Sequence, residues 1–157
     1  MSSRKPLLGA VALAASLLSG CGNNNNTITD IPRAALTVSV DPTPVPPTQN
    51  VLTGVVSIGY KIHITETAGL GGVMQFVSSS VYDPTTGQLL SVTYFDGDDL
   101  VVFVGTKRIN PGETLTVPQT MSYALPDLSK NATLVINVQM LDDRDNTINQ
   151  SVLVKVE

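Results

Sequence analysis

Apolar and polar residues alternate along most of the chain from Leu36 to the C-terminus. In residues 134–140 and again in residues 152–156, every second residue is Leu, Ile, Val or Met. Side chains of a strand point alternately to opposite faces, so this pattern gives one buried face and one solvated face. Strands of parallel sheets are instead buried on both faces and joined by helices. The alternation therefore predicts an all-β, antiparallel fold.

Turn signals separate the strand-like runs. Asp83-Pro-Thr-Thr-Gly-Gln88 and Asn110-Pro-Gly-Glu113 combine the residues that tight turns require, and Gly69–Gly72 is a flexible turn. The prolines of Pro42–Pro47 cannot donate ladder hydrogen bonds, so this stretch is an edge or a connector. About seven strands with frequent turns are typical of a β-sandwich. We expect strands at 36–40, 55–67, 73–82, 89–95, 114–124, 134–140 and 152–156.

The stretch 96–105 has two interpretations. It fits a short strand, or a helical turn that Asp98 caps and Gly105 ends. If residues 98–108 form a connector, the turns at 66–72, 96–99 and 142–146 lie at one end of the sandwich. If residues 100–104 form an independent strand, the chain reverses once more and the turn at 142–146 moves to the other end. We favour the connector.

Two sequence segments resemble those of a known protein family. Tyr60-Lys-Ile-His-Ile-Thr-Glu66 and Asn110-Pro-Gly-Glu-Thr-Leu-Thr116 resemble the immunoglobulin-like modules of bacterial surface and periplasmic proteins. The resemblance covers residues 34–157 and implies a single immunoglobulin-like antiparallel β-sandwich. The Cys…Trp…Cys pattern of antibody domains is absent, because the chain has one Cys and no Trp.

The first twenty residues have the composition of a secretory signal peptide. Arg4 and Lys5 precede a short apolar run, Leu7–Leu18, which small residues follow. The run is too short for a membrane-spanning helix, which needs roughly 20 apolar residues. The segment after the apolar run is either an ordinary secretory cleavage site or a lipidation site.

Leu18-Ser19-Gly20-Cys21 resembles the lipobox of bacterial lipoprotein precursors. The resemblance implies that residues 1–20 are removed and that Cys21 carries a covalent lipid, a diacylglyceryl group with an N-acyl chain such as palmitate. Residue 22 is Gly rather than Asp, which by the same resemblance favours the outer membrane in a Gram-negative host. Residues 21–33, rich in Asn, are expected to form a tether between this lipid and a domain at 34–157.

Charge and composition exclude several function classes. Without residues 1–20 the chain keeps seven basic and thirteen acidic residues, and no basic cluster remains for nucleic acid. With Cys21 lipidated no disulfide can form within the chain. His63 is the only histidine and shares the outward strand face with Lys61 and Thr65. One His and one Cys cannot build a zinc site, and no catalytic triad is apparent.

Carboxylates in three loops are the remaining candidates for chemistry. We hypothesise an acidic rim that forms a weak calcium site, since calcium takes oxygen ligands from several loops. The alternative is that Asp is simply favoured in turns and caps, and neither Asp-rich loop has EF-hand spacing. The rim consists of Glu66, Asp98, Asp142, Asp143 and Asp145.

These features favour a non-catalytic, lipid-anchored envelope protein that acts as a binding module for an unknown protein or a polysaccharide. The alternative is a structural accessory subunit of an envelope complex, and a hydrolase is a third, disfavoured option. We expect most of the four tyrosines and three phenylalanines to lie in the core, which disfavours carbohydrate binding because that usually uses exposed aromatic platforms. No cofactor is expected beyond the lipid on Cys21.

Overall fold

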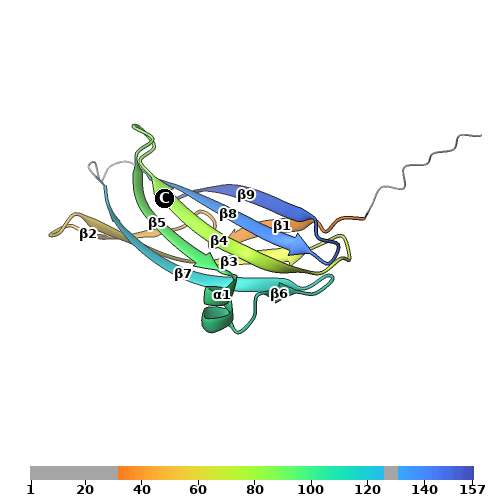
Figure 1. Ribbon diagram of the computed structural model, residues 1–157. Coiled ribbons are helices and arrows are strands. Elements are labelled where there is room, and N and C mark those ends of the chain that lie inside the picture. Colours follow the sequence, from red (N-terminus) through yellow and green to blue (C-terminus); the bar gives the residue numbers. More distant parts are fainter. Residues whose placement is uncertain (1–31, 126–130) are drawn as a thin grey trace, which may run out of the picture. The chain divides into compact units, whose positions relative to one another are not determined.

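The computed structural model describes residues 32–125 and 131–157, which form two antiparallel sheets packed face to face (Figure 1). The all-β, antiparallel sandwich that the alternation and the turns predicted is confirmed. The elements are β1 (Leu36–Asp41), β2 (Pro47–Asn50), β3 (Val55–Glu66), β4 (Gly72–Tyr82), β5 (Leu89–Asp96), α1 (Gly97–Val104), β6 (Arg108–Ile109), β7 (Thr114–Ala124), β8 (Thr133–Asp142) and β9 (Thr147–Lys155).

The smaller sheet is built around β3. One side of β3 pairs with β7 along nearly its whole length, and the other side pairs with β1 and β2 in succession. In the larger sheet the order is β5-β4-β8-β9, and β6 pairs with the start of β4 on the side of β5. The two strands that the sequence did not predict, β2 and β6, have only four and two residues.

The proline-rich segment joins the two sheets at one edge. Val45 N–H donates to the carbonyl of Lys155 at 3.1 Å, and Glu157 N–H donates to the carbonyl of Val45 at 3.1 Å. Val45 thereby forms a parallel bridge with Val156 and is fully buried. Pro42–Pro47 is therefore a connector that also covers the end of the β9 edge, which would otherwise be open to pairing with another chain.

The core lies between the sheets and is made by the inward positions of their strands. In β3, β7 and β8 every second residue is buried, as the period of two requires. The side chains are mainly branched aliphatic ones that suit a pleated surface. The largest of them are fully buried: Ile58, Ile62, Ile64, Leu134 and Ile136.

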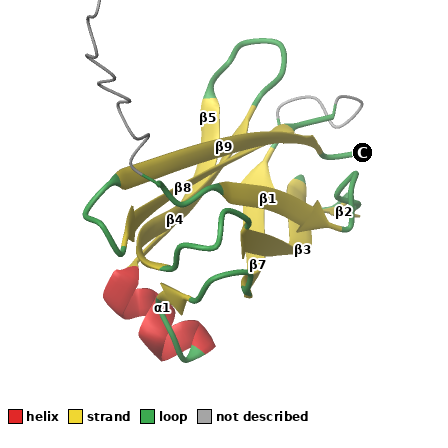
Figure 2. Ribbon diagram, turned by 90° about the vertical axis from the view of Figure 1, so that its right-hand side faces the viewer, coloured by secondary structure: helices red, strands yellow, loops and turns green. Residues whose placement is uncertain are grey.

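The ambiguous stretch after β5 is a helix and not a strand. Asp96 caps α1, because its carboxylate accepts the backbone N–H groups of Asp98 and Asp99 at 2.8 Å each. The prediction that Asp98 is the cap is wrong, whereas Gly105 ends the helix as predicted, with φ 85°. Leu100 is fully buried and anchors the helix to the core. Figure 2 shows the helix in red, below the strands.

Candidate functional site

The lipidation site, Cys21, and most of the tether lie outside the described residues, so the structure leaves the prediction for them as it stands. Within residues 32–125 and 131–157, no helix is both long and apolar enough to cross a membrane.

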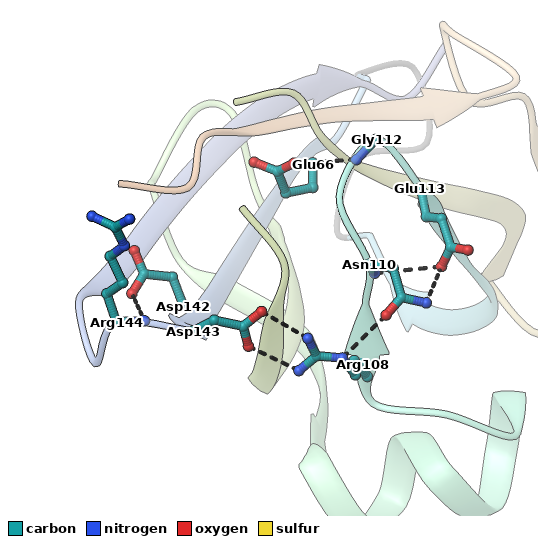
Figure 3. Close-up of polar contacts among 8 residues, drawn as sticks. All are labelled: Glu66, Arg108, Asn110, Gly112, Glu113, Asp142, Asp143 and Arg144. Carbon is teal, nitrogen blue, oxygen red and sulfur yellow. Dashed lines mark hydrogen bonds and ion pairs between the residues drawn. The ribbon is translucent and has the colours of Figure 1, made fainter. Parts of the chain in front are cut away.

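The three loops lie toward one end of the sandwich, as the connector interpretation predicted. Gly72 at the start of β4 pairs with Asp142 at the end of β8, and Phe76 pairs with Asp96 at the end of β5. The turn after Glu66 lies at this end because β3 leads directly into β4. Figure 3 shows three of the predicted rim carboxylates, Glu66, Asp142 and Asp143.

Glu66 is buried at this end, with 1% of its surface exposed. Its Oε1 accepts the N–H of Ala68 at 2.8 Å and of Ala35 at 3.3 Å. Its Oε2 accepts the N–H of Gly69 at 2.9 Å and of Gly112 at 3.2 Å. Burial alone would raise the pKa of Glu66, but these four donors lower it below its ordinary value. One ionised carboxylate thus joins three chain segments.

Asp142 has a similar role in the turn between β8 and β9. Its Oδ1 accepts the N–H groups of Arg144 and Asn146 at 2.9 and 2.8 Å, and its Oδ2 accepts the N–H of Ala34 at 3.2 Å. Burial would raise the pKa of Asp142, but the backbone and side chain of Asn146, with Ala34 and Arg144, lower it to about 2.

The other rim carboxylates are exposed and differ in their partners. Asp143 forms a bidentate ion pair with Arg108 (Figure 3). Nη1 of Arg108 donates to Oδ1 at 2.9 Å, and Nη2 donates to Oδ2 at 2.7 Å. This hydrogen-bonded guanidinium lowers the pKa of Asp143. Asp98 accepts from Lys107 Nζ at 2.7 Å, and that bond lowers the pKa of Asp98. Asp145 adopts a left-handed backbone conformation, with φ 62°.

These contacts bear directly on the calcium hypothesis. Among the described residues, no three His, Cys, Asp or Glu side chains are placed to hold a metal ion together. The oxygens of Glu66 and Asp142 already accept from N–H donors, which a cation would have to displace. The arrangement can brace loops with charge-assisted hydrogen bonds, and that is the role its geometry supports.

His63 lies on the outward face of β3, as its strand parity predicted. Its Nδ1 is 2.9 Å from the Thr116 hydroxyl on the neighbouring strand β7. It therefore makes a cross-strand polar pair on the sheet surface.

Sequence reasoning missed the outer face of the larger sheet. Outward side chains line up across its strands in register. In one row Tyr94 of β5 lies beside Ser78 of β4, followed by Asn137 of β8 and Ser151 of β9. The next row runs through Phe76, Gln139 and Asn149. On β4, β8 and β9 no side chain of these two rows carries a charge, whereas the second row continues on β5 to the carboxylate of Asp96.

Tyr94 and Phe76 form an aromatic platform on this outer face. Their ring centroids are 5.5 Å apart in a stacked arrangement, and 57% of Tyr94 is exposed. Amide and hydroxyl pairs continue the surface: Gln139 Nε2 donates to Asn149 Oδ1 at 2.9 Å, and Ser151 Oγ donates to Asn137 Oδ1 at 2.5 Å.

The expectation that most aromatic residues lie in the core is wrong. Among the aromatic residues of the described ranges, only Tyr60 and Tyr123 are buried, whereas Tyr94 and Phe103 are largely exposed. The parity of β4 could have revealed this, because Val77 and Val81 are inward and Phe76 must then face outward.

Comparison with known proteins yields structural likeness without a family. No protein-family model matches the chain, and no curated protein matches it. Among solved structures, a candidate ApaA protein from Bordetella pertussis matches with TM-score 0.56 and 16% identity, over 78% of this chain and 94% of its own. The structural-genomics target SoR45 matches with TM-score 0.56 and 14% identity, over 77% of this chain and 86% of its own.

A CARDB domain from Pyrococcus furiosus, solved in complex with di-metal ions, is a weaker match, with TM-score 0.39 and 17% identity over 79% of this chain and 87% of its own. At these identities the two stronger matches show a shared β-sandwich fold and nothing about ligands.

Proposed function

We propose that the chain is a lipid-anchored, non-catalytic binding module of the bacterial envelope, and that it binds a polysaccharide through the outer face of the larger sheet. The lipid on Cys21 would hold the domain at the membrane, in the outer membrane of a Gram-negative host. Residues 22–33 would then let the sandwich reach material some distance from the anchor.

The observation that carries this proposal is the platform of Tyr94 and Phe76 beside uncharged amides and hydroxyls. The C–H face of a sugar ring is apolar and packs on an aromatic ring, as other apolar groups do. Asn, Gln and Ser side chains both donate and accept hydrogen bonds, which matches sugar hydroxyls. A neutral glycan fits a surface whose two central rows carry no formal charge on β4, β8 and β9.

The titratable groups support a non-catalytic role. The buried carboxylates, Glu66 and Asp142, are each held by several N–H donors and so are poor candidates for proton transfer. His63 pairs with Thr116 on the outward surface of the smaller sheet and faces no carboxylate in the contacts described.

A sedimentation assay with peptidoglycan sacculi and with insoluble neutral polysaccharides tests the proposal. Tyr94→Ala should weaken binding about tenfold, because one well-placed aromatic contributes roughly 1 kcal/mol or more. Thr116→Ala, an exposed change on the outer face of the smaller sheet, is the matched control and should leave binding unchanged.

Two results would contradict the proposal. One is the absence of any polysaccharide that sediments the protein, and the other is binding that Tyr94→Ala and Thr116→Ala leave equally intact. Stable crosslinking in intact cells to a single envelope protein, with no glycan binding, would favour the structural accessory subunit.

A further inference from the structure

A groove runs along the open side of the sandwich, between the free edges of β5 and β7. These two strands belong to different sheets and are not paired with each other. The end of α1 closes one side, since Phe103 stacks on Phe95 with ring centroids 5.1 Å apart. The groove has a volume of about 360 Å³, within the range of small-molecule sites. It is lined by Thr93, Phe95, Phe103, Pro118, Gln119 and Thr120.

The side-chain amide of Gln119 is only half satisfied. Gln119 lines the groove, yet only 6% of its surface is exposed. The Tyr60 hydroxyl donates to its Oε1 at 3.0 Å, whereas its Nε2 has no hydrogen-bond partner among the described residues. Buried polar atoms are nearly always paired, so this one requires an explanation.

One atom of the Gln119 amide lacks a partner whichever way its oxygen and nitrogen are assigned. If it were reversed, Nε2 would donate to the Tyr60 oxygen, and Oε1 would be the atom without a partner. The Tyr60 hydroxyl has two other neighbours, Met121 Sδ at 3.1 Å and the Ser79 hydroxyl. In either orientation, one buried polar atom of Gln119, a residue that lines the groove, has no hydrogen-bond partner among the described residues.

The walls of the groove restrict the chemistry of a ligand that could bind there. Two phenylalanine rings and a proline supply apolar surface, and none of the six lining side chains is ionisable. A charged ligand would lose its hydration with no opposite charge to compensate it.

An added strand does not fit the groove as well as a compact ligand. Pro118 lies in the middle of β7 and has no N–H, so the β7 edge lacks a donor that strand pairing would use. The 360 Å³ volume also suits one small group rather than an extended segment.

We propose that this groove is a binding site for a small uncharged molecule with an aromatic body and an amide group. The ring would pack against the stacked pair of Phe95 and Phe103. The ligand amide, which both donates and accepts, would pair with the free atom of Gln119. The site lies on the side of the sandwich and is separate from the outer face that we assign to polysaccharide.

Benzamide and benzoate form a matched pair of probes, with one ring and one planar head group each. The full chain carrying Cys21→Ser, labelled with ¹⁵N, is titrated with each probe while the Gln119 side-chain NH₂ signals are followed. A ligand this small should bind with a dissociation constant in the range of about 1 mM. Benzamide should shift the Gln119 signals in a saturable way, and benzoate should bind at least about tenfold more weakly.

Variants locate the binding in the groove. Phe103→Ala should weaken benzamide binding about tenfold, because it removes one wall. Val102→Ala is the matched control on the same helix, since this exposed side chain does not line the groove. Gln119→Leu should remove the discrimination between benzamide and benzoate.

Three outcomes would overturn the proposal. Gln119 signals that do not respond to benzamide, together with an exchange contact to water, would mean that water satisfies the amide. Equal binding of benzamide and benzoate would show that the site does not prefer an uncharged amide over a charged carboxylate. Equal weakening by Phe103→Ala and Val102→Ala would place the binding elsewhere.

Discussion

The Asp142 carboxylate accepts a hydrogen bond from the backbone N–H of Ala34, 3.2 Å away and 108 residues earlier in the chain. It joins the turn after β8 to the residue where the described chain enters the sandwich. Glu66 accepts the next N–H, that of Ala35, at 3.3 Å. Two buried carboxylates therefore hold the beginning of the domain, just ahead of β1.

We predict that this arrangement makes the domain labile in acid. Hydrogen bonds to Glu66 and Asp142 depress both pKa values, that of Asp142 to about 2. A depressed carboxyl pKa stabilises the fold above the unfolded value, about 4, and this stabilisation is lost as pH falls through the folded value. The urea midpoint should be nearly constant from about pH 7 to 5 and should fall between about pH 4 and 2.

Variants assign this acid sensitivity. Asp142→Asn should lower the urea midpoint at neutral pH and should flatten its fall below about pH 4, since the group no longer titrates. Asp145→Asn, in the same turn but exposed, is the control and should change neither. A midpoint that falls equally steeply in Asp142→Asn would show that other groups cause the acid lability.

Removal of the Glu66 carboxylate should be more damaging than most surface changes. Glu66→Ala leaves the N–H groups of Ala35, Ala68, Gly69 and Gly112 without their acceptor. We expect a loss of about 3 kcal/mol in the free energy of unfolding, measured by urea titration. Glu113→Ala, whose exposed carboxylate accepts from Asn110, is a matched control and should cost much less. Equal losses in the two variants would show that the burial of Glu66 has no special role.

The cap of α1 provides a direct comparison between neighbouring aspartates. Asp96→Ala removes the acceptor for two N–H groups of the first turn and should cost about 1 kcal/mol. Asp98→Ala removes only an exposed ion pair with Lys107 and should have little effect, especially at high salt. The melting midpoints of the two variants test this expectation. A larger decrease in midpoint for Asp98→Ala than for Asp96→Ala would contradict the assignment of the cap.

The same helix shows what a sequence can and cannot reveal. The spacing Asp96-x-x-Asp99 is that of a capping box, and Asp99 Oδ2 does accept the N–H of Asp96 at 3.2 Å. The capping signal was thus present in the sequence, two residues before Asp98. Strands such as β8 were predictable because one face is buried, and the period of two then fixes each side chain.

Long-range contacts were beyond the sequence pattern. Nothing near Val45 indicates that it pairs with Val156, because the partner is set by how the two sheets close against each other. The fate of the rim carboxylates was equally hidden. Asp142 and Asp143 are neighbours, yet one is buried among N–H groups and the other pairs with Arg108. Asp142 falls on an inward position at the end of β8, and this strand register is what separates the two neighbours.

Calcium should leave the stability of the domain unchanged. The N–H donors and cations that hold Glu66, Asp142 and Asp143 would have to be displaced before these oxygens could bind an ion. Melting midpoints in excess calcium and in EDTA should therefore be equal. A midpoint several degrees higher in calcium, abolished by Asp145→Asn, would support the hypothesis of a weak site at the rim.

Attachment to the membrane should depend on one atom, the sulfur of Cys21. Each buried methylene contributes roughly 0.8 kcal/mol, so several acyl chains together hold a protein durably where one chain does not. In cells fed labelled palmitate, Cys21→Ala should abolish incorporation and release the protein from the membrane fraction. Ser19→Ala keeps a residue that the lipobox accepts and should retain both label and membrane association. Membrane association that survives Cys21→Ala would show that another part of the chain supplies the anchor.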